Sequence, residues 1–156
     1  LDFLRDKPVD AFWCSPYRRS LDTIREAAEH FGMTIHTDER LREREAAPGG
    51  NVRELFRKRW ADFGWHEPGG ESLRSVQERN IAALTDILTA ERDKTVVVGT
   101  HGTALSTILN YYDPSYNCDS FLRIIDWMPF VVELDFEGTR FLGKTEHVYV
   151  EKLFKP

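Results

Sequence analysis

Residues 95–103, Thr-Val-Val-Val-Gly-Thr-His-Gly-Thr, constrain the fold of this chain more than any other segment. The β-branched run predicts a short buried strand, and the glycines and helical pattern after it predict a tight turn into a helix. A strand that leads directly into a helix is typical of a parallel sheet covered by helices. His101 falls in that turn, beside the free N–H groups of a helix N-terminus, where such sheets bind ligands and helices favour anions. The segment therefore predicts a histidine that handles phosphate.

The rest of the chain alternates in the same way between short apolar runs and helical patterns. Ser15 is expected to cap the first complete helix, with Pro16 at its first position. The expected elements are the last turns of a helix at 1–7, strands at 11–14, 34–36 and 95–100, helices at 16–31, after Asn51, at 72–91 and at 102–110, a loop at 111–120, and a hairpin that begins at 130 and turns at 137–139.

This alternation predicts an α/β three-layer sandwich, in which a mainly parallel central sheet has helices on both faces. The C-terminal hairpin would add antiparallel edge strands to that sheet. With 156 residues the chain fits a single domain, 1–156, and residues 46–70 form a candidate insertion on the substrate side.

Charge and composition narrow the classes of partner. A net charge of −5 argues against binding to nucleic acid or to an anionic membrane surface. No apolar run approaches the roughly 20 residues that a membrane span needs. Cys14 and Cys118 lie far apart and indicate no disulfide, so we expect a cytoplasmic protein. The histidines other than His101 lack metal-ligand spacing, and we expect neither a metal nor another cofactor.

Two strand-to-helix turns meet on one rim of the predicted sheet. Residues 15–19 follow the first strand and bring guanidinium groups, which grip phosphate oxygens, while His101 follows the third strand. Gly102 lets a ligand come close to the backbone. Taken singly, Arg18 and Arg19 could be solvated helix residues and His101 a hydrogen-bonded turn residue. Their common rim favours a phosphate pocket.

A cysteine-based phosphatase loop is excluded by spacing. Residues 14–19, Cys-Ser-Pro-Tyr-Arg-Arg, are similar to such a loop, but the loop would place its arginine one residue later, at Ser20. A cradle of backbone N–H groups around an anion does not tolerate that shift.

Four motifs in the right order resemble the phosphoglycerate-mutase-like branch of the histidine phosphatase superfamily. Residues 15–23 resemble its SPLxRAxxT motif, 40–43 its RLxE segment, 70–79 its GESxxxxxxR segment, and 97–102 its second-histidine motif. Together these motifs span most of the chain.

The resemblance implies roles at the matching positions. Arg19 would bind the phosphate, Glu43 would be the general acid that protonates the leaving oxygen, and His101 would bind and steady the transferring group. Backbone N–H groups near Gly102 and Thr103 would assist. Fixed cations and donors of this kind stabilise the charge that spreads over phosphoryl oxygens.

The resemblance also implies hydrolysis of small phosphate monoesters through a phosphohistidine, without a metal ion. The expected partner is a small phosphorylated substrate or inorganic phosphate, and a homodimer stays open. The family's nucleophilic histidine belongs to an Arg-His-Gly motif, however, and the only His-Gly here is His101-Gly102. We expect the complete protein to carry that motif upstream of Leu1. The alternatives are a phosphate-binding or regulatory module without turnover, and a phosphoglycerate mutase.

Overall fold

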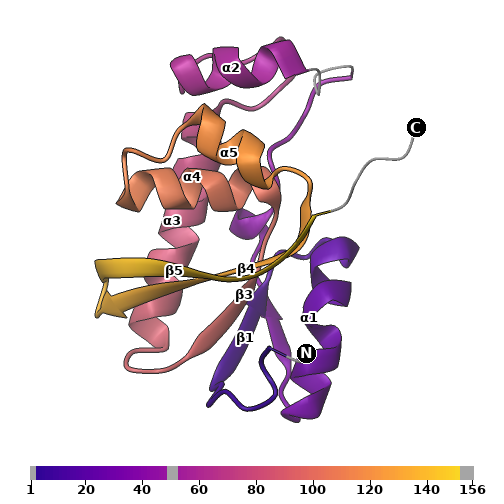
Figure 1. Cartoon of the computed structure of the whole chain (residues 1–156), viewed down its shortest axis with the longest axis vertical. Coiled ribbons are helices and arrows are strands. Elements are labelled where there is room, and N and C mark those ends of the chain that lie inside the picture. The colour runs from indigo at the N-terminus through magenta and orange to yellow at the C-terminus, as the bar shows by residue number, and fades with distance from the viewer. Residues whose placement is uncertain (1–2, 49–52, 152–156) are drawn as a thin grey trace.

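The computed structural model describes residues 3–48 and 53–151 of the chain, shown in Figure 1. In chain order the elements are β1 (Ala11–Cys14), α1 (Arg18–His30), β2 (Ile35–Thr37), the short 3₁₀ helix η1 (Glu39–Leu41), α2 (Arg53–Ala61), α3 (Leu73–Ala90), β3 (Val96–Gly99), α4 (Gly102–Tyr112), α5 (Cys118–Ile124), β4 (Trp127–Glu137) and β5 (Arg140–Glu151).

A parallel sheet of three strands, in the order β2-β1-β3, forms the middle layer. Phe12 of β1 pairs with Ile35 of β2 on one side and with Val97 of β3 on the other. The central strand is the most buried because both of its edges are paired: Phe12 and Cys14 are 0% exposed. The prediction of a parallel sheet is confirmed.

Successive side chains of β1 point to opposite faces of this sheet, and on each face they pack against a helix. Phe12 and Cys14 pack with Ile24 of α1 in one apolar cluster. Trp13 packs with Ile87 of α3 in a second cluster. Figure 1 accordingly shows α1 and α3 on opposite sides of the strands. The three-layer α/β architecture is confirmed.

The first complete helix begins later than its sequence indicates. α1 starts at Arg18 with Tyr17 as its N-cap. The hydroxyl of Ser15 accepts a hydrogen bond from the Tyr17 N–H at 3.1 Å and closes a turn before the helix, so the predicted cap at Ser15 is wrong. The predicted stop is confirmed, because α1 ends at His30 and Gly32 has a φ of +65°.

Two other segments also differ from their prediction. Residues 3–6 form turns, not the end of a helix. The region expected to be a loop at 111–120 holds the end of α4 and the start of α5. Asn117 is the N-cap of α5 and forms a capping box with Ser120. The Asn117 side chain accepts a hydrogen bond from the Ser120 N–H at 3.2 Å, and the Ser120 hydroxyl accepts one from the Asn117 N–H at 3.1 Å. This local signal, Asn-x-x-Ser, was present in the sequence but not recognised.

The C-terminal hairpin forms a two-stranded sheet of its own and adds no strand to the central sheet in the described part of the chain, so that prediction is wrong. Aromatic contacts explain where it lies. The ring of Tyr112, at the end of α4, stacks on Phe141 of β5 at 5.0 Å and meets Phe136 of β4 edge-on at 5.2 Å. These contacts direct one side of the hairpin onto α4.

Both cysteines are buried and free. Burial raises the pKa of the Cys14 thiol to about 11, although a hydrogen bond with Ser20 lowers it. Such a thiol is a poor nucleophile, in line with the exclusion of a cysteine-based phosphatase. Among the residues described, no helix has both the length and the apolar character that crossing a bilayer would require.

Candidate functional site

His101 lies where β3 gives way to α4, and the turn after β1 holds its ring. The imidazole Nε2 atom lies 2.9 Å from Ser15 Oγ and 3.1 Å from Ser20 Oγ. The Tyr17 ring packs edge-on against the imidazole, with 5.4 Å between the ring centroids. The two turns that the sequence places on one rim therefore contact each other directly. Their pairing follows from the parallel register of β1 and β3.

The surroundings of His101 keep its imidazole neutral at pH 7. Burial lowers the pKa of the ring below its ordinary value of 6.5, the nearby charges of Arg19 and Arg79 lower it further, and Glu43 opposes them. A neutral imidazole can exchange a proton with a ligand. An anion placed beside the ring would favour the charged form.

Glu43 belongs to the loop after η1, and its carboxylate lies at the N-terminus of α4, near His101. Its Oε1 atom accepts a hydrogen bond from the Ala104 N–H at 2.8 Å, and its Oε2 atom accepts one from the Thr103 N–H at 3.0 Å. The first N–H groups of a helix lack partners within the helix, so a carboxylate satisfies them well. One backbone donor predicted to bind phosphate, the N–H of Thr103, is thus engaged by Glu43.

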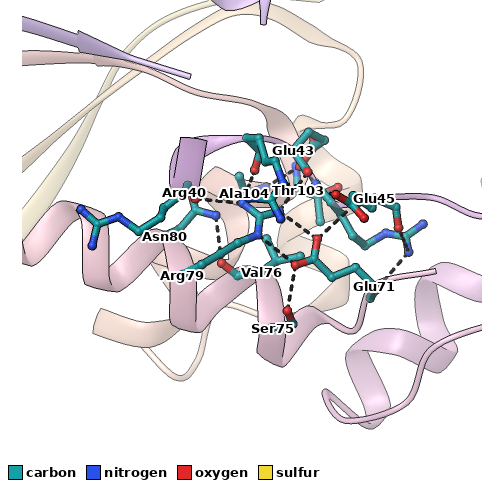
Figure 2. A network of polar contacts seen from close by, with 12 residues as sticks. Arg40, Glu43, Glu45, Glu71, Ser75, Val76, Arg79, Asn80, Thr103 and Ala104 are labelled. Atoms are coloured by element: carbon teal, nitrogen blue, oxygen red, sulfur yellow. Dashed lines mark hydrogen bonds and ion pairs between the residues drawn. The ribbon is translucent and has the colours of Figure 1, made fainter. Parts of the chain in front are cut away.

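Arg79, from the middle of α3, fixes the loop that carries Glu43. Its Nη1 atom donates to the carbonyl oxygens of Arg40 and Arg42 at 2.8 Å and 2.6 Å, and its Nη2 atom donates to the carbonyl of Glu43 at 2.9 Å. Figure 2 shows these bonds converging on one guanidinium group. A planar fork of five donors suits this task.

Glu71 completes the clamp from the opposite side of Arg79. Its carboxylate accepts from Arg79 Nε at 2.9 Å and from Nη2 at 2.8 Å, as Figure 2 also shows. Burial alone would raise the pKa of Glu71, but hydrogen bonds from Arg79, the Glu45 backbone and Ser75 lower it to about 2. The GESxxxxxxR pattern therefore has a structural meaning, because Glu71 and Arg79 together position the loop of Glu43.

The two neighbouring arginines of α1 differ in their surroundings. Arg18 is 90% exposed and lies 3.6 Å from Asp22, one turn along the helix. The guanidinium of Arg19 makes no hydrogen bond or ion pair within the described residues, yet its charge lowers the pKa of His101. Arg19, in the first turn of α1, is thus a cation near His101 whose guanidinium has no partner among the described residues.

Gly102, the first residue of α4, faces open space. A Cβ atom built at this position would meet nothing within 4 Å. Although Glu43 engages the next two N–H groups, the described residues leave open the space beside the Gly102 Cα atom.

Sequence reasoning missed a buried ion cluster beside this site. Glu67 Oε1 accepts from Arg44 at 2.9 Å and from Arg59 at 3.1 Å, and all three side chains are under 10% exposed. The two arginines border a cavity of about 30 Å³ that also touches Thr103. Such a volume holds about one water molecule. No local pattern pairs a loop glutamate with two distant arginines, so this cluster had no signal in the sequence.

Ser20 was also missed as a neighbour of His101, because only the packing of α1 on the turn after β3 brings them together. No group of three or more histidine, cysteine, aspartate or glutamate side chains in the described residues is placed to hold a metal ion.

Comparisons with known proteins agree with the fold. The family described as histidine phosphatase superfamily, branch 1, matches residues 1–125. A mycobacterial glucosyl-3-phosphoglycerate phosphatase is 22% identical with a TM-score of 0.61, over 71% of this chain and 62% of that one. The chain thus spans less than two thirds of that structure. YhfR of Bacillus stearothermophilus is 24% identical with a TM-score of 0.68, over 90% and 75% of the two chains.

A phosphoserine phosphatase of Entamoeba histolytica, solved as a mutant with phosphoserine bound, is 18% identical with a TM-score of 0.62, over 90% of this chain and 73% of that one. At these levels of identity the solved structures establish the fold. No protein with a curated description matches the chain significantly.

Proposed function

Because this chain belongs to branch 1 of the histidine phosphatase superfamily, we propose that it binds the phosphate group of a small phosphate monoester between the turns that follow β1 and β3. The observation that carries this proposal is the contact of these two turns at His101, whose Nε2 atom lies within 3.1 Å of hydroxyls from the other turn and from α1. The ring stands beside a helix N-terminus, which favours anions.

Each predicted residue has a role in this proposal. Arg19 neutralises phosphate oxygens with a guanidinium that no carboxylate of the described residues engages. His101 donates to another oxygen, and the N–H groups at Gly102 and Thr103 complete the cradle. Glu43 gives up the Thr103 N–H when it turns towards the leaving oxygen. The cationic groups come from the chain itself, so we propose a reaction that needs no metal ion.

For the complete protein we propose hydrolysis in two displacements, with the nucleophilic imidazole supplied by the family's Arg-His-Gly motif. The imidazole nitrogen attacks phosphorus while the bond to the ester oxygen breaks, and that oxygen takes a proton from Glu43. Water then attacks the phosphohistidine, the P–N bond breaks, and Glu43 takes a proton from the water. The products are an alcohol and inorganic phosphate. The free cysteines favour the cytoplasm as the site of this reaction.

A second candidate function is phosphate binding without turnover. It is favoured by the hydroxyls, imidazole and helix N-terminus that meet at His101, because these groups can hold an anion without any nucleophile. The same pocket would then sense or carry phosphate. A phosphoglycerate mutase is a further alternative that shares the phosphohistidine.

One experiment separates these functions. The 156-residue chain and a form extended upstream to an Arg-His-Gly motif are assayed with p-nitrophenyl phosphate, and binding of inorganic phosphate to both is measured by calorimetry. Activity in the extended form alone supports the hydrolase, and binding without activity in both forms supports the module. In an active form, His101→Ala should lower kcat by orders of magnitude with the fold intact. Absence of phosphate binding in every form would refute the proposal.

A further inference from the structure

The hydroxyl of Ser20 has three polar neighbours: the carbonyl oxygen of Thr100, the His101 ring and the Cys14 thiol. The protonated thiol can donate to this hydroxyl and does not compete for its hydrogen, so the other two neighbours decide where the hydrogen atoms of His101 lie. The hydroxyl oxygen is 3.1 Å from the carbonyl oxygen of Thr100 and 3.1 Å from His101 Nε2. Ser20 is only 3% exposed, so water has little access to this hydroxyl. The SPLxRAxxT motif that residues 15–23 resemble has alanine where this chain has Ser20.

The single hydrogen of the Ser20 hydroxyl determines which nitrogen of the neutral His101 ring carries the proton. A carbonyl oxygen only accepts, so the single hydrogen of the Ser20 hydroxyl is used on Thr100. Ser20 can then offer only a lone pair to the imidazole, and Nε2 must carry the hydrogen between them. The neutral ring consequently has a bare Nδ1 atom, for which no partner occurs among the residues described.

Ser15 does not fix the tautomer of His101 in the same way. Its hydroxyl oxygen accepts from the Tyr17 N–H at 3.1 Å and lies 2.9 Å from Nε2. Its own hydrogen has no other acceptor, so Ser15 could either accept a hydrogen from Nε2 or donate one to it. With Ser20 absent, Ser15 could therefore support either tautomer.

We propose that Ser20 is a positioning residue that holds the proton of His101 on Nε2, so that Nδ1 takes up a proton from solvent when a phosphate dianion binds. This inference rests on the proposed phosphate site. The balance is simple: a neutral imidazole, a phosphate dianion and one solvent proton give an imidazolium paired with the dianion. The only bond that forms is the N–H bond at Nδ1, with a proton supplied by solvent, and no other reactant is needed.

The charged groups around the ring set the pH range of this uptake. Glu43, on the N-terminus of α4, favours the imidazolium, whereas Arg19 of α1 and Arg79 of α3 oppose it. The Cys14 thiol of β1 contacts Ser20 and stays protonated, since its pKa is about 11. Phosphate binding should therefore strengthen as the pH falls towards the range in which free His101 becomes charged.

The first test reads the tautomer directly, without any ligand. Long-range proton–nitrogen NMR spectra distinguish protonated from bare ring nitrogens, and comparison with His101→Asn assigns the signals among the five histidines. At a pH where the ring is neutral, wild type should carry the proton on Nε2. Ser20→Ala should shift the balance towards Nδ1–H, because Ser15 can then donate to Nε2.

Two variants make the tautomer test specific. Ser15→Ala keeps Ser20 and should leave the proton on Nε2. Ser106→Ala removes another buried serine hydroxyl, in α4, and controls for a general loss of packing. A wild-type ring with its proton on Nδ1, or a Ser20→Ala ring that keeps the wild-type tautomer, would overturn the inference.

The second test measures proton uptake. Titration of inorganic phosphate in buffers of different ionisation enthalpy gives the number of protons taken up per phosphate bound. At a pH where inorganic phosphate is the dianion and the free ring is neutral, wild type should take up close to one proton. Ser20→Ala should take up distinctly less, because a ring that already carries its proton on Nδ1 can donate to phosphate while it stays neutral. Equal uptake in both proteins would overturn the inference. No phosphate binding to wild type would overturn the proposed function and the coupled uptake, while the NMR spectra would still decide the tautomer.

Discussion

Arg79 Nη2 donates a hydrogen bond of 2.9 Å to the backbone carbonyl of Glu43. Through this bond α3 determines where the Glu43 carboxylate meets the N-terminus of α4. Arg79, which places the carboxylate, thus lies on a helix that supplies no group of its own to the proposed phosphate cradle. This separation of positioning from binding makes the following predictions testable one at a time.

Arg79→Ala should lower the free energy of unfolding by about 3 kcal/mol, because it leaves the largely buried carboxylate of Glu71, 12% exposed, without its ion partner. Urea unfolding followed by circular dichroism measures the change. Arg25→Ala is the control, since Arg25 forms an exposed pair with Asp22 at 2.9 Å and should matter little. Similar small losses in both variants would show that the clamp does not stabilise the fold.

The stability of the protein should fall in acid because of Glu71. Its pKa drops from an ordinary 4.5 to about 2 on folding, so its contribution is complete above 4.5 and is lost as the pH falls towards 2. Urea midpoints measured from pH 7 to pH 3 should decline more steeply in wild type than in Glu71→Gln. Glu71→Gln should also be less stable than wild type at pH 7. Parallel pH curves for the two proteins would contradict this assignment.

Arg19→Ala should weaken the binding of phosphate or vanadate by about tenfold to a hundredfold, the worth of charge-assisted hydrogen bonds to an anion. Arg18→Ala is the matched control at the preceding residue, because the Arg18 side chain is 90% exposed and pairs with Asp22. Calorimetry on both variants measures the difference. Equal affinities in the two variants would remove Arg19 from the binding site.

Two glycines provide a further matched pair. A Cβ atom at Gly99 would lie 2.7 Å from Cys14 Sγ, so Gly99→Ala should lower the free energy of unfolding by about 1–3 kcal/mol. A Cβ atom at Gly102 meets nothing within 4 Å, so Gly102→Ala should leave the stability unchanged. Its methyl group should instead obstruct phosphate. Thermal unfolding and phosphate titration check both effects, and normal phosphate binding by Gly102→Ala would place the anion elsewhere.

Two predictions from the sequence were wrong for one reason, which is that a local pattern is compatible with several tertiary partners. Ser15 before Pro16 fits an N-cap, but in the structure its hydroxyl bonds to the Tyr17 N–H and lies next to His101. The hairpin strands alternate as edge strands of a large sheet would, yet Tyr112 binds them to α4. In each case a contact distant in sequence overrides a local preference.

The sequence by itself determined the alternation of strands and helices from β1 to α4 and the presence of a histidine at the end of a buried strand. Both follow from the periodicity of apolar residues within short segments, which does not depend on contacts between the segments. Tertiary structure decided which groups surround that histidine, because Ser20 is 81 residues and Ser15 86 residues away from it along the chain. Only the parallel pairing of β1 with β3 and the packing of α1 bring these hydroxyls to the ring, and a hydrogen bond forms only between atoms that packing has already brought within reach.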